Sequence, residues 1–508
     1  MEVLENEDNE PATFEQAIRK TGFGKFNVTL MALTFFGICS PMFETTNMSY
    51  IFASAQCDLD LSLQDKGYLN SMVYAGMITS SFFWGFLLDI LGRKKLMIFG
   101  YFIDATFLIL SGFSQSFSML LLCKFFGGFI ICGPFAAMAA YLSEFHSSSY
   151  RARIQVVSGL FTGIAQIILP LLAWAIMPLP IKWSLFDGFI ELHSWNIFLF
   201  VTGLCPFIAG TIFSFLSESP KFLMTSGKNE KALKVLQKVY SKNTGNSPES
   251  YPVKELVQEK EVIELSDVDP KPKVKIINGG MSNIGLLFKP NYISKFALIT
   301  AIQVTFMASL NMLRLWTPQL FQALEDYKVH NNGSTSDLCT MLTVLQPNPT
   351  MDSCLSNVAK PDAYFHSMIV ASVGVVSYVF TGSVIHRIGK KNLLILTALL
   401  GALICFSLIY SRGVMITMIL VSLFTSCGNI CTNVILSVIV DVFPTSLRAL
   451  ALSLVMALAR IGVVLGNIFF PMLLEQGCHP PFLVVAGIIG VGGVLCFILP
   501  NTENAALK

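Results

Sequence analysis

Five ionisable side chains stand inside long apolar stretches of the sequence: Glu44, Asp104, Lys124, Arg314 and Arg460. Burying an unpaired charge in hydrocarbon is costly, so such residues usually line a polar cavity, relay protons or pair with one another. A guanidinium binds a carboxylate through two parallel hydrogen bonds. A carboxyl shielded from water is a candidate proton carrier. These residues therefore point to solute binding or ion coupling inside a membrane, and for Asp104 and Lys124 a structural role is the stronger interpretation.

Two tryptophans, Trp174 and Trp316, also lie in apolar stretches. Their depths in the expected helices would allow them to form opposite walls of one pocket, and aromatic faces suit sugars and organic cations. The alternative is that each only anchors a helix at the membrane surface, where tryptophan is enriched. Both interpretations stay open from the sequence.

Two local patterns recur with one constant spacing. The first pattern consists of Gly85, Asp89, Gly92, Arg93 and Lys94, and it returns as Gly382, His386, Gly389, Lys390 and Lys391, where 382 − 85 = 297. The second consists of Glu144 and Arg151, and it returns as Asp441 and Arg448, where 441 − 144 = 297. A shared offset in two unrelated patterns indicates that the chain contains a structural repeat.

Each residue type in the first pattern has a physical use. Glycine permits close helix approach and tight turns, so Gly85 and Gly92 are expected at such places. The basic residues have a simpler alternative role, because positive charge alone sets the orientation of membrane helices. His386 is largely neutral near pH 7, so a weaker contact is expected in the second half than at Asp89.

The composition describes a membrane protein. Apolar residues make up 53% of the 508 residues and charged residues 13%, where a soluble domain has about 25% charged. Apolar runs of about 20 residues are long enough to cross a bilayer as helices. The net charge of +2 gives no argument for nucleic acid binding. No catalytic triad, metal-ligand cluster or phosphate-binding loop is present, so neither an enzyme nor a cofactor or metal is expected.

The hydropathy pattern predicts an all-α membrane protein with twelve transmembrane helices in two pseudo-symmetric six-helix bundles. The first six helices are expected at about 27–54, 66–88, 95–113, 118–142, 153–177 and 195–216. The second six are expected at about 293–320, 363–386, 391–411, 413–439, 449–474 and 481–500. The resulting division is an N-terminal segment 1–26, bundles 27–216 and 293–500, a linker 217–292 and a tail 501–508.

The distribution of Lys and Arg predicts the orientation. The loops after the second, fourth, eighth and tenth helices and the linker are basic, whereas the opposite loops carry few positive charges. Both termini and the linker are therefore expected in the cytosol. In the linker, residues 232–240 have apolar side chains at helical spacing, which predicts an amphipathic helix lying against the cytosolic face.

The extracytosolic loop 321–362 has two expected modifications. Asn332 begins an Asn-Gly-Ser sequence, an acceptor for N-glycosylation. Cys339 and Cys354 lie in the same loop, and an oxidising compartment favours a disulfide between them. Two free thiols are the alternative.

The repeated motif resembles the signature of the major facilitator superfamily. Residues 217–221 (Ser-Glu-Ser-Pro-Lys) and 441–448 (Asp-Val-Phe-Pro-Thr-Ser-Leu-Arg) resemble its sugar and organic-ion branches. Residues 174–178 and 189–195 resemble the synaptic vesicle glycoprotein 2 family. The chain departs from the family at Pro41, where an acid is common, and at Lys124, where arginine is common.

The resemblance implies a site between two bundles and a motion that opens it to each side in turn. Glu44, Trp174, Arg314, Trp316 and Arg460 are then expected in the solute cavity, with Arg460 free to bind a carboxylate or to pair with Glu44. The repeated motif residues and Glu144, Arg151, Asp441 and Arg448 are expected to form a gate together with Glu218 and Lys221.

The function expected from this resemblance is secondary transport of a small organic solute, an organic ion or a sugar-like molecule, and coupling to protons or ions stays open. The alternative is a transporter-like protein of secretory or synaptic vesicles that acts by binding ligands or proteins. The expected location is the plasma membrane or a vesicle membrane, and the oligomeric state is not determined by the sequence.

Overall fold

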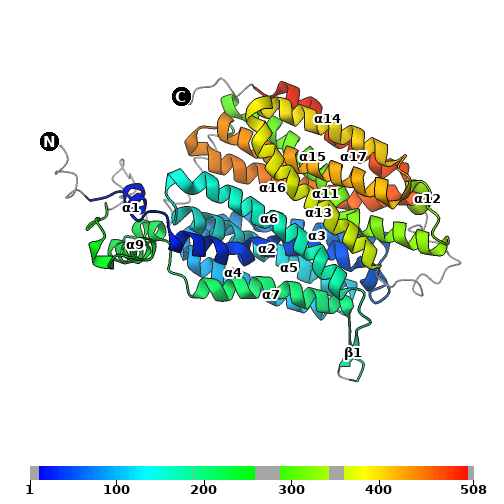
Figure 1. The fold of residues 1–508 in the computed structure, drawn as a ribbon, viewed down its shortest axis with the longest axis horizontal. Coiled ribbons are helices and arrows are strands. Elements are labelled where there is room, and N and C mark those ends of the chain that lie inside the picture. The colour runs from blue at the N-terminus through cyan, green and yellow to red at the C-terminus, as the bar shows by residue number, and fades with distance from the viewer. Residues whose placement is uncertain (1–10, 186, 258–286, 343–359, 501–508) are drawn as a thin grey trace.

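The structure is a computed structural model that describes residues 11–185, 187–257, 287–342 and 360–500. Twelve long helices dominate these residues, as predicted, and run alongside one another (Figure 1). The N-terminal bundle consists of α2 (Lys25–Ala55), α3 (Leu63–Leu91), α4 (Arg93–Gly112), α5 (Phe117–Glu144), α6 (Ser148–Ile176) and α7 (Ser194–Ser214). The C-terminal bundle consists of α11 (Pro290–His330), α13 (Pro361–Ile388), α14 (Lys390–Leu408), α15 (Gly413–Val442), α16 (Thr445–Gln476) and α17 (His479–Leu495). Eleven helices in the described part of the chain are long and apolar enough to cross a membrane, and α3 packs among them on α5 and α16.

The predicted end of the seventh helix, near residue 320, is wrong. Helix α11 continues to His330 because its last turns, which contain Ala323 and Leu324, are still packed into the core of the C-terminal bundle. The described loop after it is correspondingly shorter and contains the short helix α12 (Leu338–Met341). The connection between α6 and α7 forms an antiparallel hairpin of β1 (Lys182–Leu185) and β2 (Ile190–His193), which the sequence did not predict.

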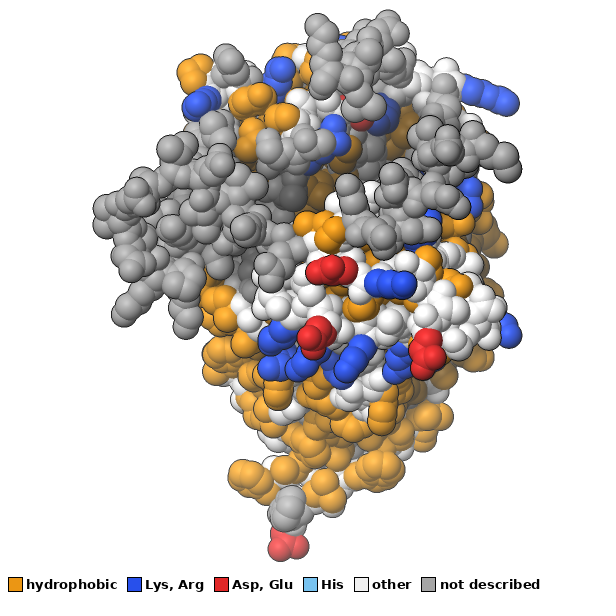
Figure 2. Space-filling view, turned by 90° about the vertical axis from the view of Figure 1, so that its left-hand side faces the viewer, with side chains coloured by type: hydrophobic (Ala, Val, Ile, Leu, Met, Phe, Trp, Pro, Cys, Tyr) orange, Lys and Arg blue, Asp and Glu red, His pale blue; other side chains and the backbone are white. Residues whose placement is uncertain are grey.

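One end of the molecule, named here the basic end, carries the loops around residues 92–95 and 389–391. Figure 2 shows this end, where Lys and Arg side chains gather together with several acidic groups beside a broad hydrophobic surface. The opposite end, named here the disulfide end, carries α12. The clustering of positive charge at one end is the pattern from which the sequence predicts a cytosolic side.

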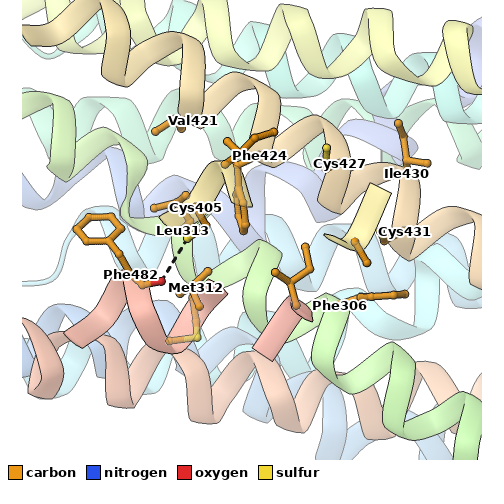
Figure 3. Close-up of a cluster of buried hydrophobic side chains, with 14 of the residues drawn as sticks. Phe306, Met312, Leu313, Cys405, Val421, Phe424, Cys427, Ile430, Cys431 and Phe482 are labelled. Carbon is orange, nitrogen blue, oxygen red and sulfur yellow. Dashed lines mark hydrogen bonds between the residues drawn. The ribbon is translucent and has the colours of Figure 1, made fainter. Parts of the chain in front are cut away.

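Each bundle has its own hydrophobic core. In the C-terminal bundle, Phe306 of α11 and Phe424, Cys427 and Cys431 of α15 are buried together with Phe482 of α17 (Figure 3). The thiol of Cys405 on α14 donates to the backbone carbonyl of Phe482 at 3.4 Å. The cysteines here act as small apolar side chains, as predicted.

A small helical cluster stands at the basic end beside the N-terminal bundle. It consists of α1 (Phe14–Lys20), α8 (Pro220–Thr225), α9 (Asn229–Thr244) and η1 (Pro248–Ser250). The predicted amphipathic helix is α9, but its buried side chains Ala232 and Leu236 pack on α1 and on Tyr251. Its apolar side is therefore covered by protein, because the N-terminal segment and the linker fold together.

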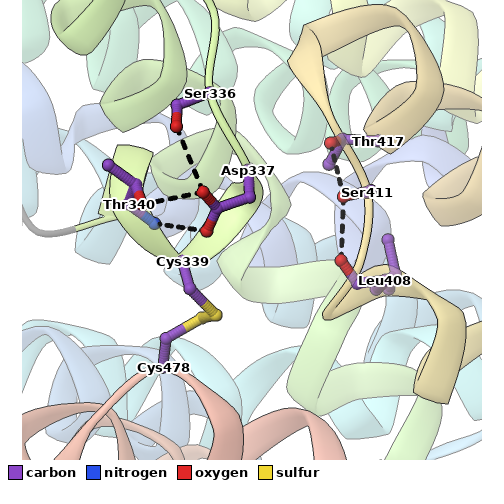
Figure 4. The surroundings of a disulfide bond; sticks show 8 residues. All are labelled: Ser336, Asp337, Cys339, Thr340, Leu408, Ser411, Thr417 and Cys478. Carbon is purple, nitrogen blue, oxygen red and sulfur yellow. Dashed lines mark hydrogen bonds between the residues drawn. A yellow bond between two sulfur atoms is a disulfide. The ribbon is translucent and has the colours of Figure 1, made fainter.

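The predicted disulfide between Cys339 and Cys354 is wrong. Cys339, in α12, is bonded to Cys478 at the start of α17, with their Cα atoms 5.3 Å apart (Figure 4). Asp337 accepts a hydrogen bond from the Thr340 backbone and caps α12, which fixes the position of Cys339. Cys57 is also disulfide-bonded, and Cys354 lies outside the described residues. The bond ties α12 to α17 across 139 residues of sequence.

Candidate functional site

An open cavity, named here the central cavity, lies between the two bundles. It has a volume of about 580 Å³ including the space that opens to solvent. The N-terminal bundle contributes Met42, Thr46, Tyr50, Ala165, Gln166 and Leu169. The C-terminal bundle contributes Arg314, Thr317, Ser367, Val370, Ala371, Gly374, Thr425 and Asn429. A solute bound here would contact both halves.

Sequence reasoning missed most of these residues, although a signal was present. Residues 42, 46 and 50 of α2 recur at every fourth position, as do residues 425 and 429 of α15, so each set lies on one helix face. Uncharged polar residues such as Gln166 and Asn429 need hydrogen-bond partners in a membrane helix, so they also indicate helix contacts or a polar cavity. Among the residues that line the cavity, charge in an apolar stretch marks only Arg314.

Arg314 is placed in the central cavity as expected. Its Nε is buried and has no hydrogen-bond partner among the described residues. The phenols of Tyr50 and Tyr378 lie within electrostatic range of its guanidinium. The arginine therefore brings one positive charge to a cavity whose other lining residues, within the described ranges, are neutral.

Glu44 does not line the central cavity, which corrects the expectation. Its carboxylate is paired with Lys124 of α5 at 3.1 Å, and the two side chains are 1% and 0% exposed. Lys124 also donates to the side-chain oxygen of Asn47 at 3.2 Å. A Cβ at Gly127 would lie 2.3 Å from the Glu44 carboxylate, so glycine makes room for the pair.

Asp104 of α4 completes this buried cluster. Its side chain is 0% exposed, and neither carboxyl oxygen has a hydrogen-bond partner among the described residues. It interacts electrostatically with both Glu44 and Lys124. Two acids and one base therefore lie together inside the N-terminal bundle, away from the central cavity.

Arg460, Trp174 and Trp316 are also outside the central cavity. Arg460 of α16 donates toward Ser81 at 3.4 Å, at the contact with the other bundle. Of the two alternatives for Arg460, pairing with Glu44 does not occur, because Glu44 is bonded to Lys124.

The tryptophans do not form two walls of one pocket. Trp174 is 46% exposed on the outside of α6, where a role in anchoring the helix fits better. Trp316 is 2% exposed, stacks on Phe470 at 5.2 Å and lines a small separate cavity inside the C-terminal bundle.

The two bundles are in contact toward the disulfide end. The phenol of Tyr364 on α13 donates to the backbone carbonyl of Tyr50 on α2 at 3.1 Å, and both residues are buried. Ser71 on α3 donates to the carbonyl of Val464 on α16 at 3.2 Å. These contacts join the halves on the side of the central cavity that faces the disulfide end.

The bundles diverge toward the basic end. A Cβ at Gly163 of α6 would lie 2.8 Å from Val375 of α13, so the helices touch there. One turn closer to the basic end, a Cβ at Gly159 would have no described atom within 4 Å. Val156 and Val379 continue these same two helix faces and are 73% and 69% exposed. The central cavity therefore opens toward the basic end.

The motif glycines separate into two kinds. A Cβ at Gly85 or Gly382 would have no described atom within 4 Å, so close helix approach at these positions is not what this conformation uses. Gly92 has a φ of 85°, which glycine adopts readily, and forms the tight turn expected of it; Gly389 has the same φ in the second half. The side chains of Asp89 and His386 lie outside the described residues.

The charged motif residues form contacts inside each bundle. Arg93 is paired with Glu144 at 3.1 Å, and the other Glu144 oxygen accepts from Ser219. The Lys94 backbone donates to Glu218 at 3.0 Å. In the other half Lys390 is paired with Asp441 at 2.6 Å. Because 390 − 93 = 441 − 144 = 297, the repeat places an equivalent ion pair in each half.

Arg151 and Arg448 occupy equivalent positions as well. Arg151 donates to the carbonyl of His146 at 3.2 Å, and Arg448 donates to that of Phe443 at 2.9 Å, each five residues back in the chain. Both arginines hold the turn after a long helix, where basic groups are favourable. Neither pairs with Glu144 or Asp441, so the two repeated acids and these two arginines serve separate contacts. Lys221, expected in the same network, instead lies over the ring of Phe14 at 5.9 Å.

Arg151 also holds α1. Its guanidinium is paired with Glu15 at 2.8 Å, and the Ser148 backbone donates to the same carboxylate at 2.6 Å. Partial burial opposes ionisation of Glu15, but the hydrogen bonds from Ser148 and the charge of Arg151 outweigh it and lower the pKa of Glu15 below its ordinary value. Burial lowers the pKa of the neighbouring His146.

Asn332 follows the last residues of α11 with a φ of 50°. It lies in the exposed connection to α12, where an acceptor asparagine is accessible. Its glycosylation stays a prediction.

Comparison with known proteins agrees with this geometry. The family model "Major Facilitator Superfamily" matches residues 29–346 and 357–508. Synaptic vesicle glycoprotein 2B of Rattus norvegicus is 24% identical over 100% of this chain and 88% of its own length. Synaptic vesicle glycoprotein 2A of Rattus norvegicus is 28% identical over 61% of this chain and 44% of its own length.

Solved structures have the same fold. A D-xylose-proton symporter superposes with a TM-score of 0.62 at 13% identity, over 95% of this chain and 99% of that one. An inward-open structure of the xylose transporter XylE from E. coli gives 0.63 at 12% identity, over 94% and 97%. With a family model that matches nearly the whole chain, two six-helix bundles and a cavity between them, this chain belongs to the Major Facilitator Superfamily.

Proposed function

We propose that this protein is a secondary transporter that carries a small organic solute through the central cavity by alternating access. The observation that carries the proposal is a cavity lined by both bundles, closed at Tyr50 and Tyr364 and open toward the basic end. A binding site between two rocking halves is the arrangement that alternating access requires.

The orientation of the protein in the membrane is proposed from the distribution of charge. Lys and Arg concentrate at the basic end, and such loops remain on the cytosolic side of a membrane. With the basic end in the cytosol, the conformation described here faces inward. The outward-facing conformation would bring Val156 and Val379 together and separate Tyr50 from Tyr364.

The charged contacts at the basic end are proposed to act as a gate. Arg93 with Glu144 and Lys390 with Asp441 each brace the turn at the base of one bundle. When the basic end closes, these two braced surfaces would meet. Four further residues lie four or seven positions from these pairs in the sequence and are proposed to belong to the same gate: Asp89, His386, Arg151 and Arg448.

Ion coupling is proposed to involve the buried cluster of Glu44, Asp104 and Lys124. A cluster with one more acid than bases can take up a proton without leaving an unpaired positive charge. An imposed pH gradient across proteoliposomes tests this. Uptake that responds to the gradient in the native protein and loses the response in Glu44→Gln supports coupling, and equal responses reject it.

The transport proposal is tested by uptake into proteoliposomes from a panel of organic acids, amines, zwitterions and sugars. Asn429 and Gln166 line the central cavity from opposite bundles. Asn429→Ala and Gln166→Ala should therefore reduce uptake of the accumulated solute. Trp174→Ala, on the exposed side of α6, is the matched control and should transport normally. Accumulation of nothing in the panel, or equal uptake by all variants, contradicts the proposal.

A second candidate is a role in secretory or synaptic vesicles by binding ligands or proteins. It is favoured by the relation to synaptic vesicle glycoprotein 2B, which extends over the whole chain. A protein of this kind would bind a solute in the central cavity without moving it across the membrane. Fractionation of the native membranes would distinguish a vesicle location from the plasma membrane.

A further inference from the structure

The lining of the central cavity carries a net positive charge. Arg314 is the single charged residue that lines the cavity within the described part of the chain. The remaining lining side chains are neutral, with polar groups on Thr46, Gln166 and Asn429 and apolar groups on Met42 and Val370. A solute in this cavity therefore meets one fixed positive charge.

Neither Glu44 nor Glu325 is paired with Arg314. Glu44 is bound to Lys124 in the N-terminal bundle. Glu325, on the same helix as Arg314, lies 11 residues further along, roughly 16 Å at 1.5 Å per residue, and is paired with Lys328. The Nε of Arg314 is buried without a described partner.

The buried Nε of Arg314 lacks a described partner, and an anion that enters the cavity would supply both a hydrogen-bond acceptor and a counter-charge. We propose that the central cavity binds a small organic anion whose carboxylate pairs with Arg314. The planar guanidinium matches a carboxylate through two parallel hydrogen bonds. This inference rests on the proposed function and names the class of its substrate.

The other lining residues indicate the chemistry of the rest of the ligand. Met42, Leu169 and Val370 offer an apolar surface for a hydrocarbon body, and Gln166 and Asn429 offer neutral hydrogen-bonding groups. An organic cation would meet a like charge without a carboxylate to offset it. A neutral sugar would leave the guanidinium unpaired. An organic acid with an apolar or weakly polar body satisfies both parts of the cavity.

The test measures binding to the purified full-length protein with acetate, benzoate and 2-naphthoate as probes. Benzamide and benzylamine serve as the neutral and cationic counterparts of benzoate, and sodium chloride at equal ionic strength serves as the inorganic control. We expect saturable binding of the carboxylates and much weaker binding of the amide and the amine.

Variants separate the charge from the shape of the site. Arg314→Gln should weaken carboxylate binding about 10- to 100-fold, the value of a charge-assisted hydrogen bond, and Arg314→Lys should lose less. Met42→Trp should weaken binding by filling the cavity without changing its charge, which keeps the test decisive if Arg314→Gln does not fold. Arg460→Gln, which removes the same charge outside the cavity, should bind normally.

Several results would overturn the proposal. They are binding of benzamide or benzylamine as tight as that of benzoate, displacement of benzoate by chloride alone, equal binding by Arg314→Gln, and no binding of any carboxylate probe. Failure of the transport proposal looks different. Carboxylates that bind through Arg314 but are never accumulated would leave the anion site intact and reject transport, whereas an amine or sugar accumulated by Arg314→Gln would reject the anion and keep transport.

Discussion

Removing Lys124 is expected to be among the most damaging single changes in the membrane region. Lys124 and Glu44 are 0% and 1% exposed and joined at 3.1 Å, and Asn47 is the other described partner of the lysine. Lys124→Met removes one partner and leaves the Glu44 carboxylate buried beside Asp104. Breaking a buried pair in this way costs about 3–5 kcal/mol.

The double variant is expected to behave differently. Glu44→Gln with Lys124→Met replaces both charges by neutral groups of similar size, a change that is often neutral for buried pairs. It should recover most of the stability lost in Lys124→Met. Together with the Glu44→Gln single variant, these two variants complete a double-mutant cycle that measures the coupling between the two residues.

Thermal unfolding of the purified protein in detergent is a suitable assay, with the fraction remaining monodisperse after heating as the readout. Since unfolding of such proteins is commonly irreversible, variants are compared at one heating rate. The matched control is Lys182→Met, which breaks the exposed pair of Lys182 with Glu191 and should cost under about 1 kcal/mol. Lys124→Met as stable as the native protein, or a double variant no better than the single one, would refute the reasoning.

Three further predictions concern the two ends of the molecule. Cys478→Ser should release Cys339 as a free thiol and cost about 2–4 kcal/mol, and a Cys339 peptide linked elsewhere in non-reducing mass spectrometry would contradict the pairing. Arg93→Gln should destabilise the protein more than Lys390→Gln in the same heating assay, because the Arg93 pair is 14% and 8% exposed and the Lys390 pair 29% and 32%, and equal effects would reject this. Docking of α1 should be lost in acid: a carboxylate with a lowered pKa contributes stability above its ordinary value of 4.5 and loses it as pH falls through the lowered value. Thiol labelling of a cysteine introduced at the buried Ala17 should therefore be faster in Glu15→Gln than in the native background at pH 7, and the difference should vanish in strong acid.

The helices and the repeat were predictable because they depend on local patterns. Apolar runs identify the spans, and the offset of 297 identifies equivalent positions such as Arg93 and Lys390. The contacts between these positions were harder to predict from the sequence. An offset shows which residues are equivalent but not which are partners, so the pairing of Glu144 with Arg93 could not be read from it.

The candidate site was predictable in part. Arg314 was found because charge in a membrane helix is rare, whereas the side on which Glu44 faces depends on the packing of α2 against α5. The disulfide was missed because nearness in sequence favoured Cys354, while the folded chain brings Cys478 to Cys339. Packing of whole helices decides these contacts, and one sequence does not display it.

In alternating access the basic end must close for a solute to cross the membrane. Cysteines introduced at Val156 and Val379 lie on the two faces that diverge here and should approach each other only in the outward-facing conformation. The measurement is uptake of the transported solute by Val156→Cys/Val379→Cys in proteoliposomes, before and after oxidation and again after reduction. We expect uptake in the reduced protein, loss of uptake when the disulfide forms and recovery on reduction, with both single-cysteine variants unaffected. Undiminished uptake by the cross-linked protein would contradict alternating access through the central cavity.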